Sequence, residues 1–167
     1  MTEDENFDDA AYFGMVKCID DNVGRMITKL RELGLENRTV IVFTSDHGDM
    51  RGEHGRQNKG VPYETSARIP FIVSAPGLLP AGARTDAVLS TIDFKPTLLS
   101  LLGVQPAKPS RGRDVSTVLR GTAARTPEDD LVFVRSPGVR AGTAWLMAVG
   151  GGYKLVANAV DPLWLID

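Results

Sequence analysis

One apolar run constrains the fold of this chain more than any other feature. Residues 39–45 (TVIVFTS) are β-branched at their centre and do not alternate between apolar and polar side chains. Such a run is typical of a strand that is covered on both faces, as strands of parallel sheets are. Residues 69–75 (IPFIVSA) show the same pattern. The sequence therefore predicts an α/β fold built on a parallel sheet with helices above and below it.

Amphipathic segments predict the helices that cover this sheet. Between residues 12 and 33 the apolar positions recur in alternating steps of four and three, which places them on one stripe of a helix packed on the sheet. A second helix is expected over residues 94–102, capped by Asp93, and a short one around residues 115–120.

The pattern changes near the C-terminus. Residues 131–135, 143–149 and 153–157 read as short strands, and three consecutive glycines join the last two. We therefore expect residues 1–125 to belong to the α/β domain and residues 126–167 to form a small antiparallel β subdomain.

The composition disfavours several kinds of partner. The chain has 167 residues, a formal net charge of −2 and no Lys/Arg run, so we expect no nucleic acid partner. No apolar run approaches the roughly 20 residues that span a bilayer, so we expect no membrane partner, and no targeting segment indicates a localisation. The single cysteine, Cys18, lies within a helical apolar pattern, and we expect it to be a small buried hydrophobic residue.

Polar residues with metal-binding chemistry follow the first strand directly. Asp46-His47-Gly48 comes at the carboxyl end of residues 39–45, where open α/β sheets bind ligands. A carboxylate and an imidazole are natural metal ligands, although a turn aspartate beside a solvated histidine is the alternative. The following loop contains His54, Lys59 and repeated glycines, which let the backbone approach a ligand closely.

A set of motifs in a fixed order resembles the C-terminal half of the sulfatase family, within the alkaline phosphatase superfamily. The motifs are Ile19-Asp-Asp-Asn-Val-Gly24, Thr44-Ser-Asp-His-Gly48, Lys59-Gly-Val-Pro-Tyr-Glu64, Arg68-Ile-Pro70, residues 93–102, Gly112-Arg-Asp114 and Tyr153-Lys154. The resemblance extends from about residue 12 to residue 167. It implies part of an alkaline-phosphatase-like sheet with flanking helices, followed by a small C-terminal antiparallel sheet.

The resemblance implies roles for three residues. Asp46 and His47 match two ligands of a divalent cation, which polarises a sulfate oxygen. Calcium is favoured, and manganese or zinc would also suit a site that includes an imidazole. Lys59 matches the lysine that contacts the ester group and neutralises its charge.

Three further residues of this region are expected to support the site without taking part in the chemistry. His54 is expected to shape the loop. Glu64 and Arg68 are expected to form an ion pair near the site, because a charge that enters a buried strand needs a partner.

The chain lacks the family's nucleophile motif, a Cys/Ser-x-Pro-x-Arg sequence whose first residue is oxidised to formylglycine. Ala107-Lys-Pro-Ser-Arg111 has the right spacing, but alanine occupies the reactive position. We therefore expect this chain to be the C-terminal part of a sulfatase, with formylglycine only in an N-terminal part. Alone it should be inactive, and it should self-associate because it cannot cover its own sheet.

Three functions remain open. The first is part of a metal-dependent hydrolase of sulfuric esters, acting on a sulfate-ester small molecule or glycan. The second is a phosphonate monoester or phosphodiester hydrolase of the same superfamily. The third is a non-catalytic module that stands alone.

Overall fold

The computed structural model describes residues 9–124, 126, 130–136, 138 and 144–166. The helices and strands among them are, in chain order, α1 (Asp9–Glu32), η1 (Glu36–Arg38), β1 (Ile41–Thr44), η2 (Glu53–Gly55), α2 (Glu64–Ala67), β2 (Phe71–Ser74), α3 (Thr91–Leu101), α4 (Ser116–Leu119), β3 (Val132–Ser136), β4 (Trp145–Gly150), β5 (Tyr153–Asn158) and β6 (Trp164–Ile166). None of the described helices is long and apolar enough to cross a membrane.

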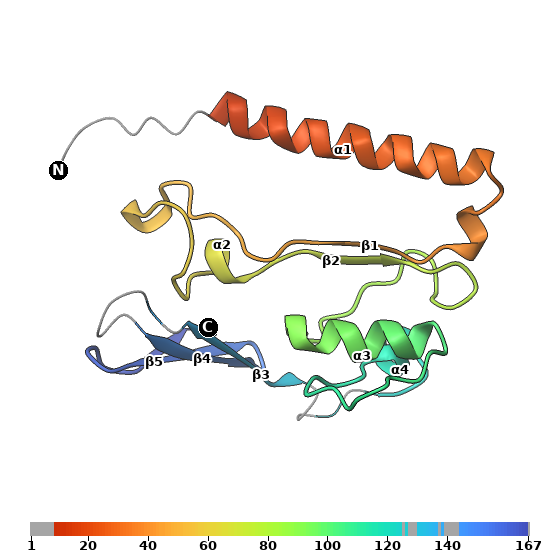
Figure 1. Ribbon diagram of the computed structural model, residues 1–167. Coiled ribbons are helices and arrows are strands. Elements are labelled where there is room, and N and C mark those ends of the chain that lie inside the picture. The colour runs from red at the N-terminus through yellow and green to blue at the C-terminus, as the bar shows by residue number, and fades with distance from the viewer. Residues whose placement is uncertain (1–8, 125, 127–129, 137, 139–143, 167) are drawn as a thin grey trace.

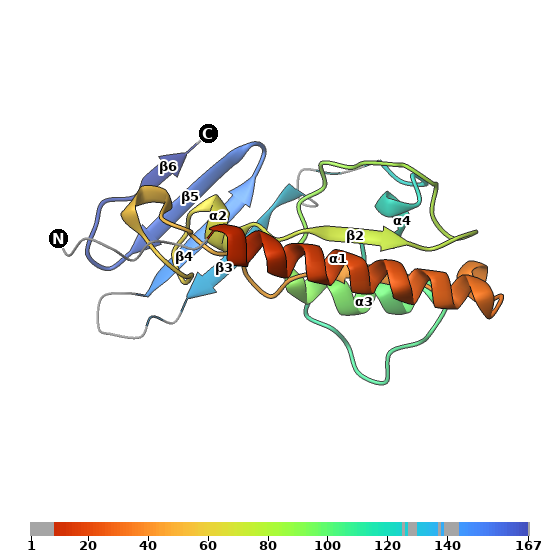
Figure 2. The ribbon, with the colours of Figure 1, turned by 90° about the horizontal axis from the view of Figure 1, so that it is seen from above.

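The elements form layers around a two-stranded sheet. Helix α1 runs along one side of β1 and β2, and α3 with α4 lies on the other side, as Figures 1 and 2 show from two directions. The four strands β3 to β6 form a separate sheet near α2 and the loop that follows β1. This is the α/β arrangement with flanking helices and a small C-terminal antiparallel sheet that the sequence predicts.

The direction of the first sheet corrects the prediction. Strands β1 and β2 pair antiparallel, with Ile41 opposite Ser74 and Thr44 opposite Phe71. The two strands are also only partly covered, since Phe43 and Ile72 are exposed. A continuous apolar run indicates a strand, but it carries no information about the direction of the neighbouring strand.

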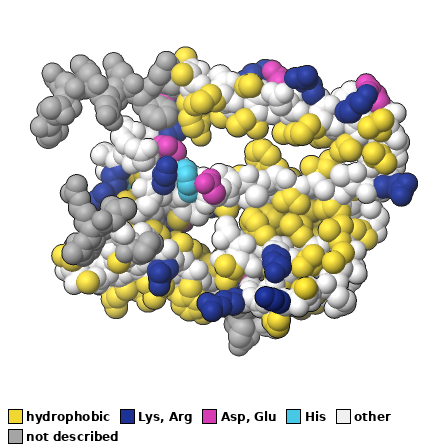
Figure 3. All heavy atoms as spheres, in the orientation of Figure 1, with side chains coloured by type: hydrophobic (Ala, Val, Ile, Leu, Met, Phe, Trp, Pro, Cys, Tyr) yellow, Lys and Arg dark blue, Asp and Glu magenta, His cyan; other side chains and the backbone are white. Residues whose placement is uncertain are grey.

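Helix α1 spans the predicted segment but is not packed against the sheet as expected. It has no buried residue, and its apolar stripe is exposed at Val16, Ile19 and Met26. Figure 3 shows open space between this helix and the apolar side chains below it. Cys18 is exposed as well, so the expectation of a buried thiol is wrong.

Contacts near its N-terminal end join α1 to the loop after β1. The guanidinium of Arg51 pairs with Asp9 and lies 3.8 Å from the centre of the Tyr12 ring.

A buried carboxylate organises the second helical layer. Asp93 is the third residue of α3 rather than its cap, because the helix begins after Ser90. Its carboxylate accepts the backbone N–H of Ser90 at 3.0 Å and the backbone N–H of Arg113 at 2.7 Å. The guanidinium of Arg113 also pairs with it at 2.7 Å. These bonds fix α3 against the segment that leads into α4.

The C-terminal sheet is antiparallel, in the order β3-β4-β5-β6. The predicted strands are confirmed where the structure describes them, while residue 143, the first of the predicted middle strand, lies outside the described residues. The short β6 is an addition that the sequence analysis did not include. Gly151 and Gly152 form the turn between β4 and β5 with φ values of 59° and 84°, which suit a tight hairpin turn. One face of the sheet is buried at Met147 and Val156.

Candidate active site

The two predicted metal ligands lie side by side directly after β1. The carboxylate Oδ2 of Asp46 is 3.5 Å from the ring Nε2 of His47, and both side chains are exposed to solvent. Figure 3 shows histidine, acidic and basic side chains gathered on one open face of the molecule. The pair can therefore meet a ligand from solvent without any rearrangement of the backbone.

A backbone carbonyl orients the imidazole of His47. The ring Nδ1 lies 2.8 Å from the carbonyl oxygen of Gly48. Because a carbonyl oxygen can only accept, Nδ1 must carry the proton in this bond. A neutral ring then keeps its lone pair on Nε2, the nitrogen that faces the Asp46 carboxylate. Metal-binding histidines are commonly oriented in this way by a partner on the other ring nitrogen.

Local hydrogen bonds keep the Asp46 carboxylate ionised. Its Oδ1 accepts the backbone N–H of His47 at 3.0 Å. The pKa of Asp46 is lowered, chiefly by a hydrogen bond from its own backbone N–H, and hydrogen bonds from the His47 backbone and the Ser45 hydroxyl add to this, so that together they outweigh the opposing effect of burial. An ionised carboxylate is the form that binds a cation.

Ser66 joins the segment that carries Asp46 and His47 to the segment that carries Lys59. Its carbonyl oxygen accepts the backbone N–H of Gly48 at 2.9 Å, and its hydroxyl accepts the backbone N–H of Gly60 at 3.1 Å. Ser66 is buried. An ideal Cβ on Gly48 would lie 1.9 Å from the carbonyl oxygen of Thr65, so this approach requires glycine.

Lys59 lies on the loop between η2 and α2. The carbonyl oxygen of the preceding Asn58 accepts the backbone N–H of Met50 at 2.7 Å, which anchors the loop beside Lys59. Within the described residues, no hydrogen bond or ion pair engages the Lys59 ammonium, and its side chain is exposed. The structure thus joins the backbone segments of His47 and Lys59, while the position of the ammonium relative to Asp46 and His47 stays a prediction.

The neighbouring residues have structural contacts. The ring of His54 stacks on Tyr63 at 4.2 Å, in agreement with a role in shaping the loop. Glu64 pairs with Arg68 at 3.8 Å, which confirms the predicted ion pair. Glu64 also pairs with Lys154 of β5, a contact that the sequence analysis did not foresee. The motif Tyr153-Lys154 was the only signal for it, and that motif implied no role.

The donor set fits only part of a metal site. No group of three or more His, Cys, Asp or Glu side chains that could hold a metal occurs among the described residues. Asp46 and His47 supply one carboxylate and one imidazole, so the described residues provide only part of a cation's ligands.

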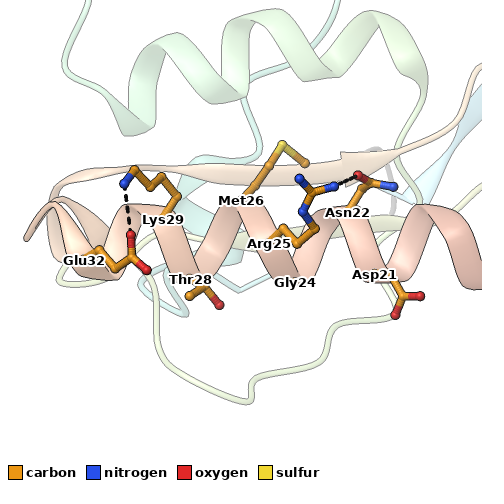
Figure 4. Close-up of a pocket in the computed structure, with 8 residues that line it drawn as sticks. All are labelled: Asp21, Asn22, Gly24, Arg25, Met26, Thr28, Lys29 and Glu32. Carbon is orange, nitrogen blue, oxygen red and sulfur yellow. Dashed lines mark hydrogen bonds and ion pairs between the residues drawn. The ribbon is translucent and has the colours of Figure 1, made fainter.

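A surface hollow elsewhere in the structure is unrelated to this pair. All eight residues that line it belong to α1, including Asn22, Arg25 and Met26, as Figure 4 shows. It is an open hollow beside one helix, distant in sequence from Asp46 and His47.

Comparison with known proteins agrees with the family resemblance. An arylsulfatase of Clostridium perfringens is 47% identical over 93 residues, which cover 54% of this chain and 19% of that protein. A solved structure of a protein in complex with its substrate D-glucosamine-2-N,6-O-disulfate matches 91% of this chain and 32% of its own, with 30% identity and a TM-score of 0.80. The phosphonate monoester hydrolase of Agrobacterium radiobacter matches 93% of this chain and 34% of its own, with 26% identity and a TM-score of 0.81.

The two solved structures share the alkaline-phosphatase-like fold with the present structure. This chain spans about a fifth to a third of the lengths of the three proteins. The sequence model of the sulfatase family matches residues 2–104, which is more than half of the chain. The chain therefore belongs to the sulfatase family.

Proposed function

We propose that this chain supplies two metal ligands and a substrate-contacting lysine to a metal-dependent sulfuric ester hydrolase. The observation that carries the proposal is the orientation of His47, whose Nδ1 is engaged by the Gly48 carbonyl at 2.8 Å while Nε2 faces the Asp46 carboxylate. A bound divalent cation would polarise an oxygen of the sulfate group. Lys59, whose ammonium has no partner among the described residues, would neutralise charge on the ester.

The proposed cation is calcium, with manganese or zinc as the alternatives. The carboxylate of Asp46 suits all three, and the imidazole of His47 suits manganese and zinc better than calcium. Two protein ligands leave most coordination positions to water, so we expect binding to be weak.

The proposed substrate is a sulfate-ester small molecule or a sulfated sugar. Two similar proteins support this class by name: the solved structure with a disulfated glucosamine, and an N-acetylglucosamine-6-O-sulfatase of Bacteroides thetaiotaomicron that is 36% identical over 118 residues. A phosphonate monoester is the second candidate, because the fold matches the phosphonate monoester hydrolase of Agrobacterium radiobacter as closely as it matches the structure bound to the disulfated glucosamine. A non-catalytic module is the third.

A titration of ligands into the chain tests the proposal. Manganese is added first, and paramagnetic broadening of the histidine ring signals is followed by NMR in the wild type, in Asp46→Asn and in His47→Gln. The control is His54→Gln, since His54 stacks on Tyr63 and is not a proposed ligand. We expect weak binding that both ligand substitutions abolish and the control retains. Binding that survives loss of His47 would refute the ligand assignment.

The substrate class is tested in the same preparation. Phenyl sulfate and the monophenyl ester of methylphosphonate are added to the metal-loaded chain, and affinity is compared with that of Lys59→Ala. A preference for the sulfate ester that depends on Lys59 supports the sulfatase proposal. A preference for the phosphonate favours the second candidate, and no binding of either favours a non-catalytic module.

A further inference from the structure

The C-terminal sheet makes direct hydrogen bonds to the backbone that follows Lys59. The indole Nε1 of Trp145, at the start of β4, donates to the carbonyl oxygen of Gly60 at 2.9 Å. The ammonium of Lys154, in β5, donates to the carbonyl oxygen of Pro62 at 3.2 Å. These bonds join residues separated by 85 and 92 positions in the sequence. Both acceptors lie within three residues of Lys59.

The Lys154 ammonium is buried, with only 7% of the residue exposed. A buried charge is costly unless it is paired and hydrogen-bonded. Here the Glu64 carboxylate pairs with it and the Pro62 carbonyl accepts from it. Glu64 is the first residue of α2, so the ion pair fixes the far end of the same loop.

A third contact comes from β6. The ring of Trp164 lies 6.2 Å from the ring of Tyr63, which in turn stacks on His54. The chain from η2 to α2 is thus contacted by three successive strands of the sheet.

These three side chains project from one face of the sheet. Lys154 is directly opposite Val149, and Trp164 is directly opposite Val156. Since side chains alternate along a strand, Trp145 shares a face with Val149, and Lys154 shares a face with Val156. This is the buried face, whereas the opposite face exposes apolar side chains to solvent. In Figures 1 and 2 the loop between β1 and α2 lies beside this sheet.

We infer that the C-terminal sheet positions the Lys59 loop of the active site, with Trp145 and Lys154 as positioning residues. The inference rests on the proposed role of Lys59. Neither residue is assigned to the chemistry. They hold the carbonyl groups of Gly60 and Pro62, and so fix the backbone that directly follows Lys59 and with it the direction in which Lys59 is presented.

The choice of residue at position 154 supports a positioning role over simple packing. A well-packed apolar side chain in place of a buried ion pair is often neutral or stabilising. A lysine at this position therefore gives the fold little that methionine would not give. What methionine cannot supply is the bond to the Pro62 carbonyl and the charge opposite Glu64.

Hydrogen exchange of the 167-residue chain tests the inference without metal or substrate. Two amides report on the loop: Met50, whose N–H is bound to the Asn58 carbonyl, and Gly60, whose N–H is bound to the Ser66 hydroxyl. In Lys154→Met and in Trp145→Phe we expect both to exchange about tenfold faster, because each variant loses at least one hydrogen bond to the loop. Amides of α3 should be unaffected.

Two further variants make the test specific. Lys154→Arg keeps the charge opposite Glu64 and should restore most of the loop protection. Tyr153→Phe changes a neighbouring exposed residue on the other face and should leave the loop unchanged.

Unchanged protection of the loop amides in both Lys154→Met and Trp145→Phe would overturn the inference. An equal loss of protection throughout the chain would overturn it too, because these residues would then only support the fold as a whole. Because neither metal nor substrate is present, failure here would leave the sulfatase proposal standing.

Discussion

Replacing Asp93 with asparagine tests how much a single buried carboxylate contributes to this fold. The Asp93 side chain is 2% exposed and accepts three hydrogen bonds, from the backbone N–H of Ser90 and from the backbone and guanidinium of Arg113. An asparagine has only one acceptor oxygen. Its least costly orientation keeps that oxygen opposite Ser90 and the guanidinium, and turns the NH₂ group toward the backbone N–H of Arg113.

The expected cost combines two losses. The Arg113 N–H is left without an acceptor, which costs about 1–3 kcal/mol, and the guanidinium loses its charged partner. Removing one member of a buried ion pair typically costs about 3–5 kcal/mol. Arg113 is partly solvated, with 30% of its side chain exposed, so we take the low end and expect Asp93→Asn to destabilise the chain by about 3 kcal/mol. Urea unfolding, monitored by circular dichroism, measures this loss of stability.

The pH dependence gives a second, independent check. Burial acts to raise the pKa of Asp93, but the hydrogen bonds from Arg113 and Ser90 outweigh it, and the net pKa is lowered. A lowered pKa stabilises the folded state above the unfolded value of about 3.9, and this contribution is lost as the pH falls through the folded pKa. The stability difference between wild type and Asp93→Asn should therefore be full at neutral pH and narrow below about pH 4.

The control removes the same charge nearby. Burial acts to raise the pKa of Asp114 as well, but hydrogen bonds from the Ser116 backbone and from the Ser100 and Ser116 hydroxyls outweigh it, and the net pKa is lowered. Unlike Asp93, however, Asp114 is exposed, and an asparagine oxygen can also accept the backbone N–H of Ser116 at 2.9 Å. Asp114→Asn should cost less than about 1 kcal/mol. The reasoning about Asp93 would be refuted if the two variants lost equal free energies of unfolding. It would also be refuted if the stability difference between wild type and Asp93→Asn did not change with pH.

Three other outcomes are expected. Gly48→Ala should destabilise the chain by about 2 kcal/mol in urea unfolding, because its Cβ would meet the Thr65 carbonyl, whereas Gly24→Ala has open space and should be neutral or stabilising. Sedimentation should show self-association through the exposed apolar side chains, and a compact monomer would contradict this. The chain alone, with calcium or manganese, should hydrolyse a chromogenic aryl sulfate no faster than Lys59→Ala; turnover that depends on Lys59 would require a nucleophile within these residues.

Local patterns were sufficient to predict most of the helices and strands. The three- and four-residue spacing in α1 and the apolar runs of β1 and β2 are properties of short segments, which is why their existence is confirmed. The pairing of β1 with β2 depends instead on the path of the chain between them. That path holds only the short helices η2 and α2, and the strands pair antiparallel.

One part of the candidate site could likewise be predicted from the sequence, and another part could not. The adjacency of Asp46 and His47 follows from their places in the chain, and their position after β1 follows from the strand that precedes them. Ser66 could not be identified from the sequence, because its function is to accept two backbone N–H groups, from Gly48 and Gly60, that come together only in the folded chain.

The segments that carry His47 and Lys59 also depend on contacts of different sequence separation. The imidazole of His47 is oriented by the next residue along the chain, so its geometry needs little beyond β1 and the turn. The segment around Lys59 depends on Ser66 and, through the Gly60 and Pro62 carbonyls, on strands more than eighty residues further along. Contacts of such separation carry a larger loop-closure cost and form later than local ones. We therefore expect the arrangement of Asp46 and His47 to be set early in folding, and Lys59 to be placed only when the C-terminal sheet has docked.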